Sequence, residues 1–232
     1  LLSRRQRQMC IRDRVEMMQR VNFGLIKKGV QIFDLTSTYI APDADIAPGA
    51  TILPGCHIRP GCKVGAGAVI GPNTILEKAE IGAGTTVNNS QVYESTVGSN
   101  TTVGPFAYIR PQSVVGDGCR IGDFVELKKS TIGNGTKVPH LSYVGDAQLG
   151  DHTNIGGGTI TANYDGVHKH HTTIGSNVHV GAGNLFVAPV TVGDGVTTGA
   201  GSVVRHDVPS DSMVYSENTQ HVVEGWKPEW ER

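Results

Sequence analysis

Residues 40–76 read IAPDADIAPGATILPGCHIRPGCKVGAGAVIGPNTIL, and every sixth residue in this stretch, beginning with Ile40, is apolar. The same spacing continues beyond this stretch, with a few five-residue steps. The apolar positions are Ile40, Ile46, Ile52, Ile58, Val64, Ile70, Leu76, Ile81, Val87, Val92, Val97, Val103, Ile109, Val115, Ile121, Leu127, Ile132, Val138, Val144, Leu149, Ile155, Ile174, Val180, Phe186 and Val192. A fixed short period over this length is typical of a solenoid, and a six-residue period predicts a parallel β-helix.

The repeat also predicts how each coil is built. We expect three hexapeptides to form one triangular coil, with the periodic residue pointing inward and small residues near the corners. Gly or Pro often follows the periodic residue, and glycine suits a tight corner because it adopts positive φ at no steric cost. At roughly 18 residues per coil, about 150 residues of repeat predict roughly eight to ten coils. Strands of neighbouring coils pair about 4.8 Å apart, so the rod would be roughly 40–50 Å long. The expected fold is therefore all-β, with a β-helix over residues 40–205.

Two segments precede the repeat. Residues 1–14 are rich in arginine and lack both glycine and the six-residue spacing, so we expect a disordered tail or a segment foreign to the natural protein. Residues 15–39 are expected to form a short linker helix and the lead-in to the repeat. Lys27 and Lys28 suit the end of that helix, just before Gly29.

Two further segments break or follow the repeat. The periodic pattern lapses over residues 161–173, which predicts a loop that projects from the rod, and functional residues often concentrate on such loops. Residues 206–232 no longer follow the pattern. They are expected to form a tail that caps the last coil with Trp226 and Trp230.

Composition excludes several classes of partner. The net charge of −1 and the pI near 6.8 give no broad attraction for nucleic acid or for an anionic membrane. No apolar run is long enough to span a bilayer, and no secretory leader precedes the repeat. The four cysteines lack CxxC spacing, so we expect free thiols in a reducing cytoplasm. Lys169 interrupts the histidines at 168–171 and would repel a cation, so no metal site is expected.

The stretch from Val138 to Tyr164 carries side chains that a purely structural repeat does not need. Candidate chemical residues there are His140, Tyr143, Asn154, Asn163 and Tyr164. His140 is interpreted either as one of these chemical residues or as a solvent-facing histidine on one face of a coil.

Cationic residues lie nearby in the sequence. Arg110, Lys128 and Lys129 could bind a phosphate. An arginine can donate two parallel hydrogen bonds to a phosphate, and a lysine supplies a point charge. The alternative is that all three are ordinary solvated surface residues.

Several longer motifs resemble one enzyme family. They are RP at 110–111, FVELKKSTIGNGTKVPHLSYVGDAQLG at 124–150, NIGGGTITANYDG at 154–166 and VAPVTVGDG at 187–195. Together they resemble the acetyltransferase half of the bifunctional N-acetylglucosamine-1-phosphate uridyltransferase / glucosamine-1-phosphate N-acetyltransferase family. The resemblance runs from about Val15 to about Trp226.

The resemblance implies a left-handed β-helix, a homotrimer with shared active sites, and acetyl transfer from acetyl-CoA to glucosamine 1-phosphate. It implies that His140 is the general base. The sugar-phosphate site would be formed by Arg110, Lys128, Tyr143 and Asn154. The acetyl-CoA site would be formed by Gly157, Asn163, Tyr164, Lys169, Ala182 and Ala200. The uridyltransferase domain of the family is not expected in this chain.

Two positions depart from the family pattern. Glu217 aligns where an arginine is common, and Ala182 replaces a frequent serine. Two other functions remain open from the sequence. One is acyl transfer to another acceptor, such as an amino acid or a different sugar, and the other is a non-catalytic or metal-binding trimer.

Overall fold

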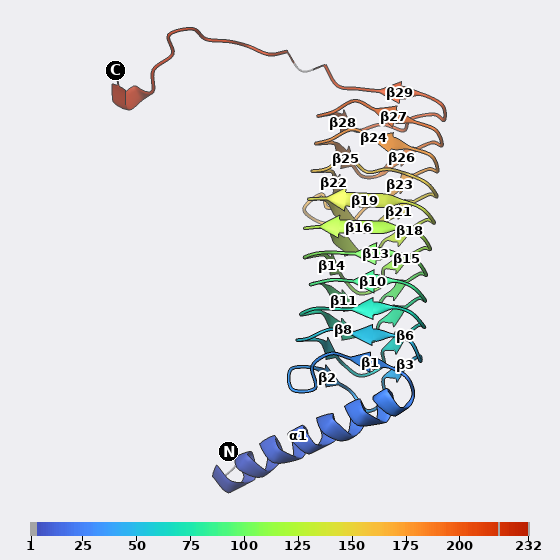
Figure 1. The fold of residues 1–232 in the computed structure, drawn as a ribbon. Coiled ribbons are helices and arrows are strands. Elements are labelled where there is room, and N and C mark those ends of the chain that lie inside the picture. The colour runs from blue at the N-terminus through green and yellow to red at the C-terminus, as the bar shows by residue number, and fades with distance from the viewer. Residues whose placement is uncertain (1–3, 218, 232) are drawn as a thin grey trace.

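In the computed structural model, which describes residues 4–217 and 219–231, the repeat forms a straight rod with helix α1 (Arg4–Lys27) at one end (Figure 1). All strand ladders within the rod are parallel, and the strands of the coils lie on three faces, named A, B and C. A short 3₁₀-helix, η1 (Glu229–Glu231), follows near the C-terminus. The predicted parallel β-helix is therefore confirmed.

Face A contains two sheets, in which the strand order follows the chain. The larger sheet comprises β1 (Gln31–Ile32), β4 (Thr51–Ile52), β7 (Val69–Ile70), β10 (Thr86–Val87), β13 (Thr102–Val103), β16 (Arg120–Asp123) and β19 (Lys137–His140). The smaller sheet comprises β24 (His179–Val180), β27 (Thr197–Thr198) and β29 (Met213–Val214). Asn154 joins the two sheets through single bridges to Lys137 and His179.

Faces B and C are continuous sheets. Face B comprises β2 (Tyr39–Ile40), β5 (His57–Ile58), β8 (Ile75–Glu77), β11 (Gln91–Tyr93), β14 (Tyr108–Ile109), β17 (Glu126–Lys128), β20 (Tyr143–Gly145), β22 (Ile160–Ala162), β25 (Leu185–Val187) and β28 (Val203–Val204). Face C comprises β3 (Asp45–Ile46), β6 (Lys63–Val64), β9 (Glu80–Ile81), β12 (Thr96–Val97), β15 (Val114–Val115), β18 (Thr131–Ile132), β21 (Ala147–Leu149), β23 (Thr172–Ile174) and β26 (Val190–Val192).

The β-helix is left-handed. In Figure 1 the front strands β16 and β19 run to the left while the chain rises from the blue to the red end of the rod. A right-handed coil would carry the front strands to the right. This handedness is an exception to the rule for parallel crossover connections, and the six-residue period does not determine it.

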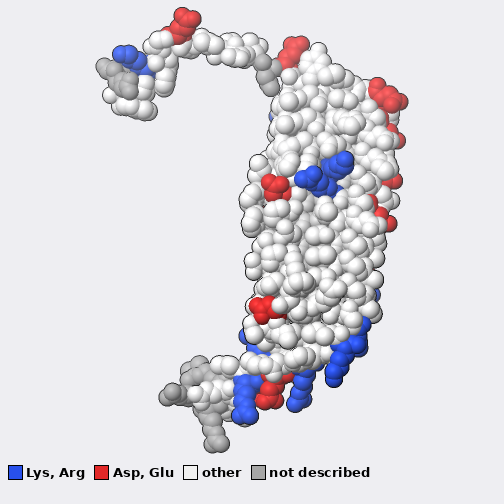
Figure 2. All heavy atoms as spheres, in the orientation of Figure 1, with Lys and Arg blue, Asp and Glu red and all other residues white. Residues whose placement is uncertain are grey.

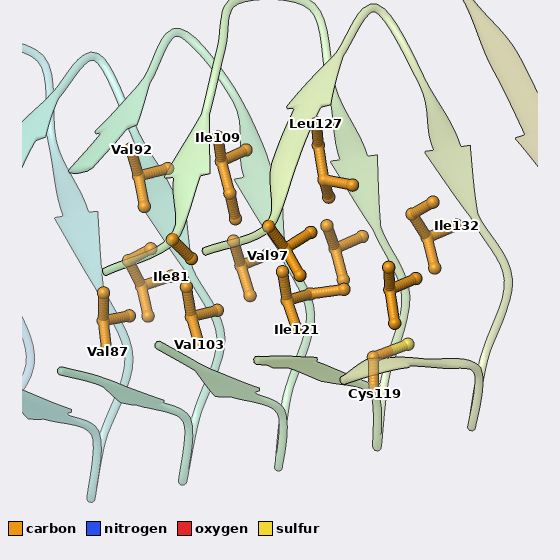
Figure 3. Packing of buried hydrophobic residues seen from close by; sticks show 14 of the residues in the cluster. Ile81, Val87, Val92, Val97, Val103, Ile109, Cys119, Ile121, Leu127 and Ile132 are labelled. Atoms are coloured by element: carbon orange, nitrogen blue, oxygen red, sulfur yellow. The ribbon is translucent and has the colours of Figure 1, made fainter. Parts of the chain in front are cut away.

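The interior consists of the periodic residues. Every one of them is buried, and those of neighbouring coils stack along the rod axis (Figure 3). The residue two positions before each periodic residue is also buried and small in most coils. Cys56, Cys62 and Cys119 occupy this position, and all three are free thiols. The expected placement of small residues near the corners is confirmed.

The corners depend on a residue with positive φ. From Ile46 to Thr161, every six-residue step has such a residue three positions after the buried one, as at Gly49 and Asn73. In each five-residue step it lies two positions after, as at Lys78 and Asp146. A side chain with a Cβ pays a steric cost in this region. The corner geometry is therefore imposed by the stacking of the coils even where glycine is absent.

Polar side chains connect successive coils along the corner between faces C and A. The Asp117 carboxylate accepts a hydrogen bond from the backbone N–H of Ser99 at 2.6 Å. One coil later, Asn134 Oδ1 accepts from Asp117 N at 2.8 Å, and Asp151 Oδ1 accepts from Asn134 N at 2.6 Å. These side chains satisfy N–H groups that the short strands leave unpaired.

The projecting loop is shorter than expected. Thr161 lies on β22 and takes an interior position, where it is buried and pairs in register with Phe186. Its hydroxyl accepts from Gly145 N at 2.8 Å and donates to Gly145 O at 3.1 Å. The six-residue pattern of buried positions therefore continues through Thr161. A polar residue can occupy this interior position because backbone atoms of Gly145 satisfy its hydroxyl. The loop comprises residues 163–171 between β22 and β23.

The N-terminal helix is longer than expected. It begins at Arg4 rather than near residue 15, so residues 4–14 are helical and not disordered. This segment lacks Gly and Pro and contains good helix formers, which explains the helix. Residues 6 and 8–14 are exposed, so burial gives the segment no apolar periodicity to detect. Near its end, the helix attaches to the first coil through buried Leu25 and through Asn22, whose side-chain amide donates to Thr38 O at 3.0 Å.

The C-terminal tail does not cap the rod. It extends away from the last coil (Figure 1), and Trp226 and Trp230 are 63% and 84% exposed. The expectation that these tryptophans cover the last coil is therefore wrong for the single chain.

We predict that Ile52→Ala lowers the free energy of unfolding by about 2–5 kcal/mol, because Ile52 is fully buried and the neighbouring coils cannot close the cavity. The measurement is denaturant unfolding followed by circular dichroism at one fixed protein concentration. Lys63→Ala is the control. It removes an exposed ion pair with Glu80 that solvent screens, so little change in stability is expected. Equal effects of the two substitutions would contradict the assignment of Ile52 to the core.

Candidate active site

One group of the residues singled out in the sequence meets at the end of face B nearest face C. Lys128 Nζ lies 2.7 Å from Asp146 Oδ2, and both side chains are largely buried. The Asn163 amide donates to the same carboxylate oxygen and lies 3.4 Å from the Tyr143 hydroxyl. The carboxylate therefore ties the start of the loop at 163–171 to two earlier coils.

Lys169 returns from this loop to the same place. It forms an antiparallel bridge with Tyr164, which closes the loop as a hairpin. The nearby Lys128 amine lowers the pKa of Lys169. Burial alone would lower the pKa of Lys128, but its hydrogen bond to the Asp146 carboxylate outweighs burial and raises it. Lys128 already pairs with Asp146, so the nearby amine of Lys169 adds positive charge to this edge.

Arg110 stands beside this group. Its guanidinium donates to Glu126 Oε1 at 2.7 Å and lies 5.9 Å from the centre of the Tyr108 ring. Its charge contributes to the lowered pKa of Lys169, and the Arg110 side chain remains 39% exposed. The structure thus brings Arg110, Lys128 and Lys169 together, as an anion site requires. We name Arg110, Lys128, Asp146, Asn163 and Lys169 the cationic cluster.

A second group lies at the corner between faces A and B. His140 ends β19, and its Nδ1 lies 3.0 Å from Asp123 Oδ1 at the end of β16. The imidazole is 52% exposed and can reach a ligand. The hydrogen bond with His140 contributes to the lowered pKa of Asp123, after the larger effect of Asp123's own backbone N–H.

Small residues continue this corner along the rod above His140. A side chain at Gly157 would contact the Cβ of His140. Gly183 N donates to Gly157 O, and Gly201 N donates to Ala182 O, each at 2.8 Å. Gly157, Ala182 and Ala200 therefore occupy corner positions in successive coils. They leave an unobstructed strip that starts at His140, and we name it the small-residue strip.

Two predicted site residues join neither group. Asn154 is half-buried on face A, where it bridges Lys137 and His179. Tyr164 is 59% exposed on the loop, and its hydroxyl donates to Gly166 O at 2.6 Å. Glu217 is exposed on the C-terminal tail.

The two groups lie at opposite edges of face B. His140 lies before β20, at the edge of face B next to face A. Asp146 lies directly after Gly145, the last residue of β20, at the edge next to face C. Within the described residues, no hydrogen bond or ion pair joins His140 to any member of the cationic cluster. A single chain therefore presents two half-sites.

The sequence interpretation missed three acidic residues. They are Asp123, Glu126 and Asp146, which pair with His140, Arg110 and Lys128, respectively. In each pair the two residues are 16 to 18 positions apart, which is about one coil. Acid–base pairs at one-coil spacing are the signal that could have found them.

Among the described residues, no group of three His, Cys, Asp or Glu side chains could hold a metal ion. Residues 4–217 and 219–231 contain two helices, α1 and η1. Neither is long and apolar enough to cross a membrane. The middle of the face seen in Figure 2 carries few charged side chains. That face offers no extended basic surface for a polyanion.

Two family models match the chain. The GMPPB C-terminal domain matches residues 91–206, and the bacterial transferase hexapeptide (six repeats) matches residues 43–78. A solved structure of the Arabidopsis UDP-N-acetylglucosamine acyltransferase aligns with a TM-score of 0.53 at 20% identity. The alignment covers 76% of this chain and 71% of that one. This similarity supports the fold.

Curated relatives are much more similar in sequence. The bifunctional protein GlmU of Bifidobacterium adolescentis is 64% identical over 229 residues, covering 96% of this chain and 50% of that protein. GlmU of Corynebacterium glutamicum is 44% identical over 211 residues, covering 91% of this chain and 44% of that protein. The chain thus spans about half the length of the curated relatives it matches.

We predict that Asp146→Asn destabilises the protein by about 1–3 kcal/mol at neutral pH, because it leaves Lys128 largely buried without its counter-charge. Asparagine tolerates the positive φ of this position, so the backbone is not the cause. Lys128 and Asn163 lower the pKa of Asp146 despite its burial. The stabilisation is therefore present above the unfolded pKa, about 4, and is lost as the pH falls through the folded pKa.

Thermal unfolding of both proteins between pH 7 and pH 3 checks this prediction. The difference in melting temperature should shrink toward the acidic end of the range. A difference that stays constant with pH would show that the Asp146 charge is not what stabilises the fold.

Proposed function

Because the chain belongs to the hexapeptide-repeat transferases as a member of the GlmU family, we propose that it transfers an acetyl group from acetyl-CoA to the 2-amine of glucosamine 1-phosphate. The product is N-acetylglucosamine 1-phosphate, a precursor of UDP-N-acetylglucosamine. The main support is the 64% identity to a GlmU protein over 96% of this chain. The half-sites described above supply a basic imidazole, an anion site and a strip free of large side chains.

His140 serves as the general base. The sugar amine must lose a proton as its nitrogen attacks the thioester carbonyl, and an imidazole can accept that proton near neutral pH. The new C–N bond forms, the C–S bond breaks, and coenzyme A leaves as the thiolate. The half exposure of the His140 side chain leaves its ring free to contact the amine.

The cationic cluster binds the phosphate of the sugar. Arg110 offers a planar pair of donors, and Lys128 and Lys169 offer ammonium groups. A phosphate dianion would favour the charged form of Lys169, whose pKa is lowered in its absence by Lys128. Anchoring the phosphate fixes the position of the amine relative to the base, and this positioning increases the reaction rate. Tyr143 and Asn154 are proposed to contact the sugar.

The small-residue strip receives acetyl-CoA. An extended chain can lie along Gly157, Ala182 and Ala200 because none of these carries a side chain larger than a methyl group. The strip begins at His140, so a thioester at its lower end would lie beside the base. Asn163, Tyr164 and Lys169 are proposed to contact the same co-substrate from the loop of a neighbouring chain.

A homotrimer completes each site in this proposal. The His140 corner of one copy faces the cationic cluster of the next, since one chain keeps them at opposite edges of face B. Bulky side chains support such a contact next to His140. Phe106, Phe124 and Leu141 are 57%, 58% and 62% exposed at consecutive corners, although each has positive φ. The rings of Phe106 and Phe124 stack at 5.5 Å, and we name the three the apolar ridge.

The reaction is proposed to run in the cytoplasm. The buried cysteines Cys56, Cys62 and Cys119 are free thiols, as is usual in a reducing compartment.

Release of thiol from acetyl-CoA tests the activity, with glucosamine 1-phosphate as acceptor and glucosamine as control. Release with the phosphorylated sugar and little with glucosamine is expected, because the cationic cluster needs the phosphate. His140→Ala should lower kcat by about 10²–10⁴ with little change in KM for the sugar phosphate. Equal rates with both acceptors would refute the substrate assignment, and normal turnover by the variant would refute the base.

The trimer is tested with Phe124→Asn. Asparagine suits positive φ better than phenylalanine, so the variant should keep or raise the stability of the single rod while it removes half of the ring stack. Sedimentation velocity should show the parent as a trimer and the variant shifted toward monomer. Acetyl transfer should fall in parallel. An unchanged trimer would show that the apolar ridge is not an interface.

A further inference from the structure

Asp123 contacts His140, the general base of the reaction proposed above, and any role of this contact rests on that proposed function. Asp123 and His140 are Cα partners in the ladder between β16 and β19, one coil apart. Their side chains meet at 3.0 Å between Oδ1 and Nδ1. Neither residue lies in the cationic cluster, and no family motif quoted above includes Asp123.

The surrounding backbone holds these two side chains together. Leu141 N donates to Asp123 O at 2.9 Å. Gly122, just before Asp123, lies so close to the carbonyl of Pro139 that any Cβ there would overlap it. Pro139 also fixes its own φ immediately before His140. The ends of β16 and β19 are therefore locked in register, and Asp123 remains beside the ring.

The contact determines which ring nitrogen carries the proton. The pKa of Asp123 is lowered by its own backbone N–H and by His140, so the carboxylate is ionised at neutral pH and can only accept a hydrogen bond. A neutral His140 must then donate from Nδ1. Its Nε2 is left with a free lone pair, which is the atom that can take a proton from an amine.

We propose that Asp123 is a positioning residue for the acetyl transfer. It holds His140 in the tautomer with Nε2 unprotonated and fixes the orientation of the ring toward the acceptor amine. During the reaction Nε2 gains the proton that the amine loses. The ionised Asp123 stabilises the resulting imidazolium and exchanges no proton itself.

The test combines the tautomer of His140 with steady-state kinetics, using the full chain. Protein labelled with ¹⁵N-histidine gives two-bond nitrogen–proton correlations, and His140→Ala identifies the His140 signals. In the parent, the neutral ring of His140 should carry its proton on Nδ1. Asp123→Asn should lose this preference, because a carboxamide can either donate to Nδ1 or accept from it. It should lower kcat by about 10²–10⁴, with KM for both substrates within about twofold.

Asp117→Asn is the matched control. Its carboxylate contacts the backbone N–H of Ser99 rather than a histidine, and an asparagine oxygen can accept the same hydrogen bond. Both the tautomer and kcat should equal those of the parent. Asp123→Ala provides a second removal of the carboxylate, and thermal unfolding verifies that each variant is folded.

The inference is overturned if Asp123→Asn keeps the parent tautomer, whatever its kcat, or if the tautomer changes while kcat does not. An inactive parent with glucosamine 1-phosphate would refute the proposed function instead. The spectra of the parent and the variants would still report whether Asp123 fixes the His140 ring.

Discussion

Stacking of one coil on the next is the constraint on which the rest of this structure depends. A strand of two to four residues cannot bury enough surface or satisfy enough backbone groups by itself. It does both only with the coils above and below, so each buried residue such as Ile109 or Leu127 lies against its equivalents one coil away. Register therefore cannot drift. A shift of one residue would turn every interior side chain outward.

The same constraint fixes the corners. From Ile46 to Thr161, the stacked coils impose a left-handed backbone conformation at each corner, whether or not glycine is present. Asparagine tolerates it well, but Phe124 and Leu141 do not. The coils that surround these residues stabilise them there. Side chains at a corner point away from the rod, so corners are where a stiff scaffold can present bulky or reactive groups without disturbing its interior.

Stacking also determines how acidic and basic side chains pair along the axis of the rod. Asp123, Glu126 and Asp146 each pair with a basic residue about one coil away, because outward positions of neighbouring coils are the closest side-chain neighbours available. In the proposed reaction, two of these pairs serve separate tasks. Asp146 holds Lys128 and the loop at 163–171 together at one edge of face B, while Asp123 is proposed to orient His140 at the other. The distance between these edges makes a second copy of the chain part of the proposed chemistry.

The sequence by itself determined the coil and its interior, because a six-residue period leaves one arrangement in which all the apolar residues from Ile40 to Val192 are buried. It also indicated His140 and the basic residues through residue types that a core does not need. It missed Asp123 and Asp146, whose partners are distant in sequence, and the interior place of Thr161, whose hydroxyl is satisfied by backbone atoms of another coil. Only the tertiary structure decided these, together with the handedness and the separation of the two half-sites. They depend on which residues the stacking brings together, and no local pattern records that.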